Sequence, residues 1–263
     1  MRFMGSLDTG ELSGTIVAVP IVNLESFRAR TPFVSPQDGK NLNRCFPGSF
    51  EGTYSDALAR AVFDEVIAPS DVLVDLHGGD LVEALEPFSL YDDSPLEDRS
   101  RALAIAFGLR YVVRSPQAGA PISGTTSSAA AAAGIPAVIA EAGGCGLLEE
   151  SAVDLHLAGI ENVLRHLGML PREPALAPPG MRSVERFVWV RCREAGWWEP
   201  SVRVGDEVQP SQVVGVVRNL SGDAIEEIVA PEDGVLLFLT SSPAVTADGL
   251  LFGLGAGISE INS

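Results

Sequence analysis

The residues best placed for chemistry are one histidine and one glutamate, each at the end of an apolar run. His77 closes the run 72–77, and Glu141 follows the run 135–140. An Asn43-Arg44 pair lies in a long segment that has neither a helical nor a strand pattern. Because ligands of open α/β sheets bind at the carboxyl ends of strands, His77 and Glu141 can converge on one site. An imidazole, a carboxylate and an anion-binding arginine make half of a metal-dependent hydrolase site.

Asp75 extends this candidate site. It lies two residues before His77 in the same apolar run. Side chains two apart in a strand share a face, so the Asp75 carboxylate can orient the imidazole. The histidine of an isolated Asp-Leu-His motif is more often structural. Here we favour a functional role for it because Asn43-Arg44 and Glu141 are also present.

Composition limits the class of protein. The 263 residues allow one large domain or two ordinary ones, and 46% hydrophobic with 20% charged residues are typical of a soluble globular protein. A net charge of −17 argues against nucleic-acid binding. Three widely spaced cysteines indicate neither a disulfide framework nor a zinc-binding cysteine cluster, which favours a reduced, cytoplasmic setting. We see no signal-peptide pattern and no membrane-spanning run.

The first two thirds of the chain alternate between strand and helix patterns, which predicts an α/β sheet with helices on its faces. The segment 21–52, which carries Asn43 and Arg44, is expected to be a long functional loop. We expect strands at 15–20, 72–77, 109–113 and 135–140, and helices at 58–66, 96–108, 125–133 and 149–168.

The last third of the chain has a different sequence pattern. Residues 171–180 are rich in Pro and Ala, and short β-rich runs separated by Gly, Asp and Pro follow from residue 184. This pattern predicts a small all-β barrel or sandwich. We therefore expect a catalytic domain over 1–170, a linker over 171–182 and a β-barrel domain over 183–263.

Three motifs together carry a resemblance to a known family: Asp38-Gly39-Lys40-Asn41-Leu42-Asn43-Arg44-Cys45-Phe46-Pro47-Gly48, then Asp75-Leu76-His77, then Glu141-Ala142-Gly143-Gly144. In this respect the chain resembles the succinylglutamate desuccinylase/aspartoacylase family of zinc-dependent deacylases, relatives of the zinc carboxypeptidases. The resemblance covers essentially the whole chain. It implies a mixed-sheet, zinc-carboxypeptidase-like domain followed by a smaller, lipoyl-like β-barrel.

The resemblance also implies roles for individual residues. His77 would be a ligand of Zn²⁺, and Glu141 would move the proton between the attacking water and the leaving amine. Asn43 and Arg44 would hold the substrate carboxylate, with Arg44 forming a two-pronged hydrogen bond. An upstream arginine, Arg30 or less plausibly Arg28, would polarise the scissile carbonyl. The implied substrate is a small N-acyl amino acid or a similar amide or ester, and a homo-oligomer is compatible with this assignment.

One part of the family pattern is missing. Family members carry a His-x-x-Glu motif shortly before a strand like 15–20, and this chain has none. We expect the first strand and this motif to be absent because the chain is N-terminally truncated. A catalytically inactive homologue that binds small carboxylates is the alternative. One histidine cannot hold a catalytic zinc tightly, so we expect the chain as given to bind zinc weakly.

Two other classes of function are excluded by missing residues. A serine esterase would need a Gly-x-Ser-x-Gly turn, which the sequence lacks. A lipoyl or biotinyl carrier would need a lysine at a hairpin tip, and the only lysine is Lys40, far from the C-terminal third. His156 and His166 lie in the expected helix 149–168, and we interpret both as structural or solvated.

Overall fold

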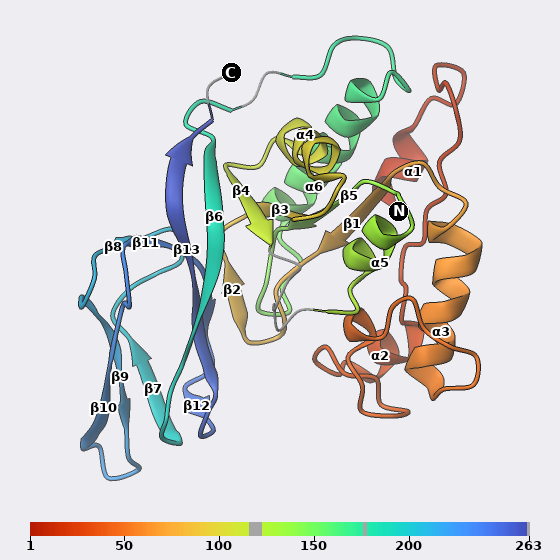
Figure 1. The fold of residues 1–263 in the computed structure, drawn as a ribbon. Coiled ribbons are helices and arrows are strands. Elements are labelled where there is room, and N and C mark those ends of the chain that lie inside the picture. Colours follow the sequence, from red (N-terminus) through yellow and green to blue (C-terminus); the bar gives the residue numbers. More distant parts are fainter. Residues whose placement is uncertain (116–122, 176–177, 262–263) are drawn as a thin grey trace.

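The computed structural model describes residues 1–115, 123–175 and 178–261 and is built around one large mixed sheet (Figure 1). Its strand order is β1-β5-β3-β4-β6-β13-β11-β2, with β8 paired to β11. The pair β1/β5 is parallel, and both strands end at the candidate residues. The strands are β1 Leu73–His77, β2 Glu83–Leu85, β3 Phe88–Asp92, β4 Tyr111–Ser115, β5 Ala137–Glu141, β6 Arg182–Arg191, β8 Glu207–Val208, β11 Gly234–Thr240 and β13 Leu250–Glu260.

Helices cover both faces of the α/β part of this sheet. On one face, α4 (Glu97–Phe107) and α6 (Glu150–His166) pack against Val138 and Ala140 of β5. On the other face, α3 (Tyr54–Val62), the π-helix η2 (Phe63–Ile67) and α5 (Thr126–Ala132) pack against Leu73 and Ala137. Because strand side chains alternate between faces, Asp75, His77 and Glu141 belong to the α5 face.

The C-terminal strands form an all-β unit with its own core. A second, antiparallel sheet has the order β10-β9-β7-β12 and faces the strands β6, β13 and β11. Trp198 of β7 and Phe252 of β13 are buried in the core between these sheets. The strands are β7 Gly196–Pro200, β9 Val213–Arg218, β10 Ala224–Val229 and β12 Ala244–Val245. The expected fold class, a mixed α/β sheet with a smaller C-terminal β unit, is confirmed.

The large sheet continues across the expected domain boundary. Strand β6 begins at Arg182 and pairs with β4 of the α/β part on one side and with β13 on the other. Residues 176–177 of the expected linker and residues 262–263 of the expected barrel lie outside the described residues. The boundaries at 170 and 183 stay predictions.

The expected strand at 15–20 is wrong. These residues form no strand, and most of them are exposed. A β-branched run becomes a strand only where a neighbouring strand supplies hydrogen bonds and packing. Within the described residues β1 is at the edge of the sheet and pairs only with β5, so residues 15–20 do not add to the sheet there.

The expected loop 21–52 contains two short helices that its sequence pattern did not reveal. Asn23 accepts a hydrogen bond from the Ser26 backbone and starts α2 (Leu24–Ala29). The Asn41 side chain likewise accepts a hydrogen bond from the Asn43 backbone and starts the 3₁₀-helix η1 (Leu42–Arg44). Asparagine side chains commonly cap such starts. The remaining helix is α1 (Arg2–Ser6), and no described helix has the length and apolar character needed to cross a bilayer.

Asp38 fastens the segment before η1 to the start of α3. Its carboxylate accepts hydrogen bonds from Thr53 Oγ1 at 2.6 Å and from the Ser55 backbone and hydroxyl, both at 2.8 Å. The Lys40 backbone donates a fourth at 3.2 Å. Burial alone would raise the pKa of Asp38, but these hydrogen bonds lower it far below its usual value. The carboxylate therefore fixes the path of the chain into Asn43 and Arg44.

Strand β2 ties the C-terminal unit to the ends of β1 and β5. It pairs with β11, and its Glu83 carbonyl oxygen accepts a hydrogen bond from the Cys145 backbone at 2.9 Å. A Cβ atom at Gly79 or Gly144 would collide with this same oxygen. The glycines after His77 and Glu141 are therefore required for β2 to approach the strand ends.

We expect Gly144→Ala to lower the free energy of unfolding by about 1–3 kcal/mol, because the new methyl group meets backbone that cannot move aside. Chemical denaturation measures this difference. Gly5→Ala is the control, since a Cβ there meets nothing within 4 Å. Equal stability of Gly144→Ala and the parent chain would contradict the close approach of β2.

We expect Asp38→Asn to destabilise the protein by about 1–3 kcal/mol at pH 7, because the charged acceptor of four hydrogen bonds is lost. The folded pKa of Asp38 is lowered, so its contribution is full above the unfolded value of about 3.9 and is lost as the pH falls below it. Urea unfolding of parent and variant at pH 7, 5 and 3 measures this.

The difference between parent and Asp38→Asn should be similar at pH 7 and 5 and smaller at pH 3. Asp71→Asn serves as the control, because Asp71 is exposed and makes no side-chain hydrogen bond within the described residues. A difference at pH 3 as large as that at pH 7 would mean that the charge of Asp38 is not responsible.

Candidate functional site

The structure brings His77 and Glu141 into direct contact. They occupy paired positions at the ends of β1 and β5, and the two strands run parallel. Paired residues of neighbouring parallel strands point to the same face of the sheet, so both side chains lie on the α5 face. His77 Nδ1 is 3.2 Å from Glu141 Oε1. The two residues that the sequence placed at separate strand ends therefore share one site.

The imidazole of His77 lies between two carboxylates. Its Nε2 is 3.1 Å from Asp75 Oδ2, opposite the contact with Glu141. An ionised carboxylate can only accept hydrogen bonds, so each ring nitrogen must act as a donor. Burial lowers the pKa of His77, but Glu141 and Asp75 together outweigh it, and the pKa lies well above its usual value. The two carboxylates therefore favour the protonated ring.

Asp75 is held by a third residue that the sequence did not single out. Burial raises the pKa of Asp75. The charge of His77 and the hydrogen bonds from His77 and Thr126 lower it by more, so the net pKa is below its usual value. The Thr126 hydroxyl donates to Asp75 Oδ2. From sequence, Thr126 is only one of several hydroxyl residues at the start of a predicted helix.

The Asn43-Arg44 segment packs onto the start of α5, close to this line of side chains. Asn43 Oδ1 accepts a hydrogen bond from the Thr126 backbone at 2.9 Å. Gly124 adopts a left-handed conformation (φ +77°), and a Cβ there would collide with the Arg44 carbonyl oxygen. The Phe46 backbone donates to the Gly124 carbonyl at 2.9 Å. The side-chain NH₂ of Asn43 makes no hydrogen bond within the described residues and is available to a ligand.

Arg44 is the cation that the site leaves without a carboxylate. Its Nη1 donates to the Asn43 carbonyl at 2.6 Å, and it forms no ion pair with any described residue. Surrounding protein lowers the pKa of Arg44 through desolvation, although the guanidinium stays charged. Arg44 is exposed, and a guanidinium without an acidic partner among the described residues is suited to binding an anion.

The structure does not bring either upstream arginine into these contacts. Arg28 pairs with Glu25 at 3.2 Å on the exposed surface of α2. Arg30 ends α2 in a left-handed conformation (φ +54°), and its exposed side chain makes no hydrogen bond or ion pair with a described residue. The role of Arg30 stays a prediction.

His156 supports the site from the opposite face of the sheet. Its Nε2 lies 3.1 Å from the carbonyl oxygen of His77. Burial lowers the pKa of His156, so the ring is neutral and Nε2 carries the proton that this carbonyl accepts. The sequence interpretation of His156 as structural agrees with this contact, but nothing in the sequence indicated that the supported residue is His77.

The described residues do not complete a catalytic zinc site. Such a site takes three protein ligands and one open position. No group of three or more His, Cys, Asp or Glu side chains that could hold a metal occurs among the described residues. Both ring nitrogens of His77 are already hydrogen bonded to carboxylates. The zinc role of His77 therefore stays a prediction.

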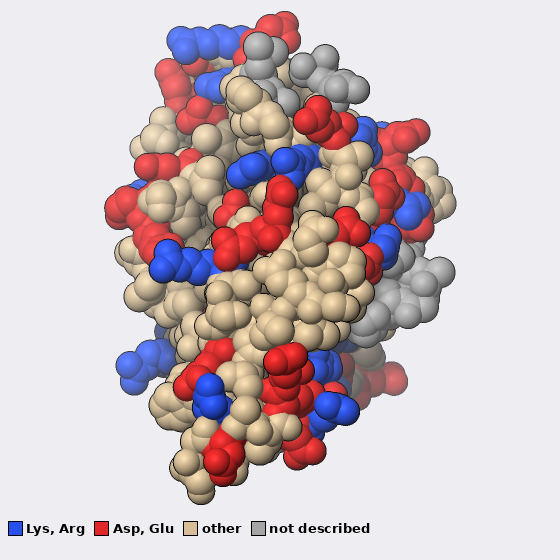
Figure 2. Space-filling view, turned by 90° about the vertical axis from the view of Figure 1, so that its left-hand side faces the viewer, with Lys and Arg blue, Asp and Glu red and all other residues tan. Residues whose placement is uncertain are grey.

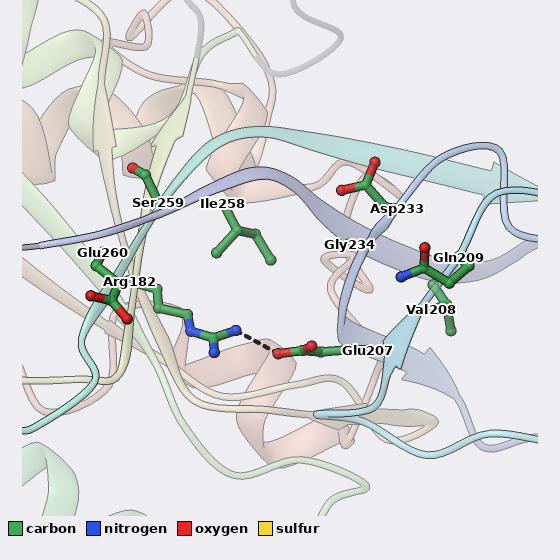
Figure 3. A pocket seen from close by; sticks show the side chains of 9 residues that line it. All are labelled: Arg182, Glu207, Val208, Gln209, Asp233, Gly234, Ile258, Ser259 and Glu260. Carbon is green, nitrogen blue, oxygen red and sulfur yellow. Dashed lines mark hydrogen bonds and ion pairs between the residues drawn. The ribbon is translucent and has the colours of Figure 1, made fainter.

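The described residues line at least two cavities. One of about 170 Å³ lies between α6 and the turns after β1 and β5, lined by Gly78, Gly79, Gly143 and His156. The other, of about 250 Å³, lies in the C-terminal unit (Figure 3). Its one arginine, Arg182, is paired with Glu207, so this larger cavity offers no free cation to an anionic substrate.

The surface of the C-terminal unit shows the same pairing of charges. In Figure 2, acidic and basic side chains are interspersed around a broad uncharged area. Arg186 pairs with Glu232, and Arg218 pairs with Glu199. Such exposed pairs contribute little to stability. Arg44, by contrast, forms no ion pair with a described residue, and it follows Asn43, which is hydrogen bonded to the start of α5.

Comparisons with known proteins point to one family. A family model described as the succinylglutamate desuccinylase/aspartoacylase catalytic domain matches residues 1–167. The chain is 32% identical over 249 residues to the N-alpha-acetyl-L-2,4-diaminobutyric acid deacetylase of Halomonas elongata, a match that covers 89% of this chain and 70% of that protein.

Solved structures share the fold over nearly the whole chain. The succinylglutamate desuccinylase/aspartoacylase from Rhodobacter sphaeroides superimposes with a TM-score of 0.85 at 27% identity, covering 100% of this chain and 80% of that one. The product-bound ectoine utilization protein EutE (DoeB) from Ruegeria pomeroyi gives 0.87 at 24% identity, covering 97% and 79%. The site motifs, the family model and the fold agree, and the chain belongs to the succinylglutamate desuccinylase/aspartoacylase family.

Proposed function

We propose that this protein hydrolyses the amide bond between a small acyl group and an amino acid. The observation that carries the proposal is the His77–Glu141 contact at the ends of two parallel strands, together with the unpaired Arg44. Family membership and the deacetylase relative of Halomonas elongata support it. The acyl group stays open between acetyl, succinyl and aspartyl-linked substrates.

Each proposed role follows from the chemistry of the side chain. Arg44 and the NH₂ of Asn43 hold the substrate carboxylate by charge-assisted hydrogen bonds. Glu141 accepts a proton from the water that attacks the acyl carbon, and a new C–O bond forms. Glu141 then returns this proton to the amine as the C–N bond breaks, which gives a carboxylic acid and a free amino group. We retain Arg30 as the proposed group that polarises the scissile carbonyl.

Zinc is our proposed cofactor for the reaction, with His77 as one ligand, and when bound it would activate water and polarise the carbonyl. The incomplete ligand set of the described residues gives weight to a second candidate, a homologue that binds small carboxylates without turnover. Metal analysis together with a hydrolysis assay separates the two. Zinc-dependent release of amine supports the enzyme, and carboxylate binding without release supports the inactive homologue.

We expect Glu141→Gln to lower kcat by about 10²–10⁴-fold, because the amide cannot accept the proton of the attacking water. The assay measures amine release, with zinc present, from N-acetyl and N-succinyl amino acids, N-acetylaspartate and Nα-acetyl-2,4-diaminobutyrate. Glu227→Gln is the control, since Glu227 is an exposed glutamate of β10. Full turnover by Glu141→Gln would remove Glu141 from the mechanism.

We expect Arg44→Lys to raise KM about tenfold or more while kcat changes little. A lysine keeps the charge but loses the two-pronged hydrogen bond to the carboxylate, and binding made equally to substrate and transition state appears in KM. Initial rates against substrate concentration measure both constants. Arg99→Lys, at an exposed position of α4, should match the parent. An unchanged KM in Arg44→Lys would assign carboxylate binding elsewhere.

A further inference from the structure

We propose that Thr126 is a positioning residue that links the Asn43-Arg44 segment to the His77–Glu141 pair. Its backbone N–H donates to Asn43 Oδ1 at 2.9 Å, and its hydroxyl donates to Asp75 Oδ2. Asp75 in turn holds His77, which contacts Glu141. Within the described chain Thr126 is thus the residue through which these two groups of side chains are joined by hydrogen bonds.

The position of Thr126 is fixed by its surroundings. It is the first residue of α5, and it is buried. Thr125 caps this helix, since its hydroxyl accepts from the Ser128 backbone at 3.0 Å while the Ser128 hydroxyl accepts from the Thr125 backbone at 3.0 Å. A β-branched side chain has few rotamers in a helix. The Thr126 hydroxyl is therefore held in place before it meets Asp75.

The hydroxyl determines how the Asp75 carboxylate is turned. One oxygen of Asp75, Oδ2, accepts from both Thr126 and His77. Without the hydroxyl, the partly buried Asp75 carboxylate would lose one of its two side-chain donors and could rotate about its terminal torsion, which is broad. His77 would then lose the fixed acceptor on its Nε2 side. Thr126 makes no hydrogen bond to His77 within the described residues, so its effect on His77 acts through Asp75.

The two connections made by Thr126 can be separated by mutation. Its bond to Asn43 uses the backbone N–H, which any substitution except proline retains. Its bond to Asp75 uses the side chain. Thr126→Val removes the hydroxyl at nearly constant shape, and Thr126→Ser keeps the hydroxyl. The Asn43-Arg44 segment should stay in place in both variants, whereas His77 should be released only in Thr126→Val.

The first measurement needs no substrate, so it does not depend on the proposed function. The chain has three histidines, and ¹⁵N-histidine labelling therefore gives a small set of ring signals that His77→Gln and His166→Gln assign. We expect the Nε2–H signal of His77 to be displaced or broadened by exchange in Thr126→Val, with the parent signal retained in Thr126→Ser. The signal of His166 should not move in either variant.

An unchanged His77 signal in Thr126→Val would overturn the proposal, and so would an equal change in Thr126→Ser. If Thr126→Val does not fold, the pair Thr126→Ala and Thr126→Ser differs only by the hydroxyl and decides the same question. Circular dichroism and thermal unfolding of each variant establish that the folded chain is being compared.

The second measurement uses turnover and rests on the proposed function. Thr126→Val should lower kcat about tenfold with KM within about twofold of the parent, as expected for a group that orients a site residue through another. Thr126→Ser should restore kcat. A normal kcat in an active Thr126→Val enzyme would overturn the positioning role. A parent chain without turnover would contradict the proposed function alone, and the ring signal of His77 would still decide the role of Thr126.

Discussion

The site depends on one imidazole held between two carboxylates at the open ends of parallel strands. His77 contacts Asp75 from its own strand and Glu141 from the neighbouring strand, so the register of β1 against β5 decides whether the three groups meet. A shift of one residue would turn either set of side chains to the opposite face. The apolar packing of α3 and α5 on one face and of α4 and α6 on the other therefore also sets the geometry of the site.

Much of this arrangement was predictable from the sequence. Continuous apolar runs located β1 and β5, and the rule that ligands bind at strand ends brought His77 and Glu141 together before any coordinates. Helical spacing located α6, and the helices expected at 96–108 and 125–133 match α4 and α5 within a residue. The same reasoning failed at residues 15–20, because strand propensity says nothing about whether a partner strand is present.

The connections between the predicted residues were not visible in the sequence. Thr126 stands among four consecutive hydroxyl residues, and only the fold shows which of them faces Asp75. The contact of His156 with the His77 carbonyl joins residues 79 positions apart. Asn41 and Asn43 look alike in sequence, yet Asn41 caps η1, whereas Asn43 accepts a hydrogen bond from the Thr126 backbone at the start of α5. Pattern and spacing identify candidate chemistry, whereas tertiary hydrogen bonds decide which polar side chains are occupied.

The place of β2 has a consequence for the evolution of the C-terminal unit. This short strand adds to the edge of β11 while its Glu83 carbonyl sits against the glycine turns beyond β1 and β5. A change in how the β unit is seated would be transmitted as a displacement of those turns. Insertions are therefore tolerable at the far hairpins, such as the one between β9 and β10, but not where the unit meets β2. The C-terminal strands are therefore constrained by the turns that they help to position, although none of the described reactive groups of the site comes from them.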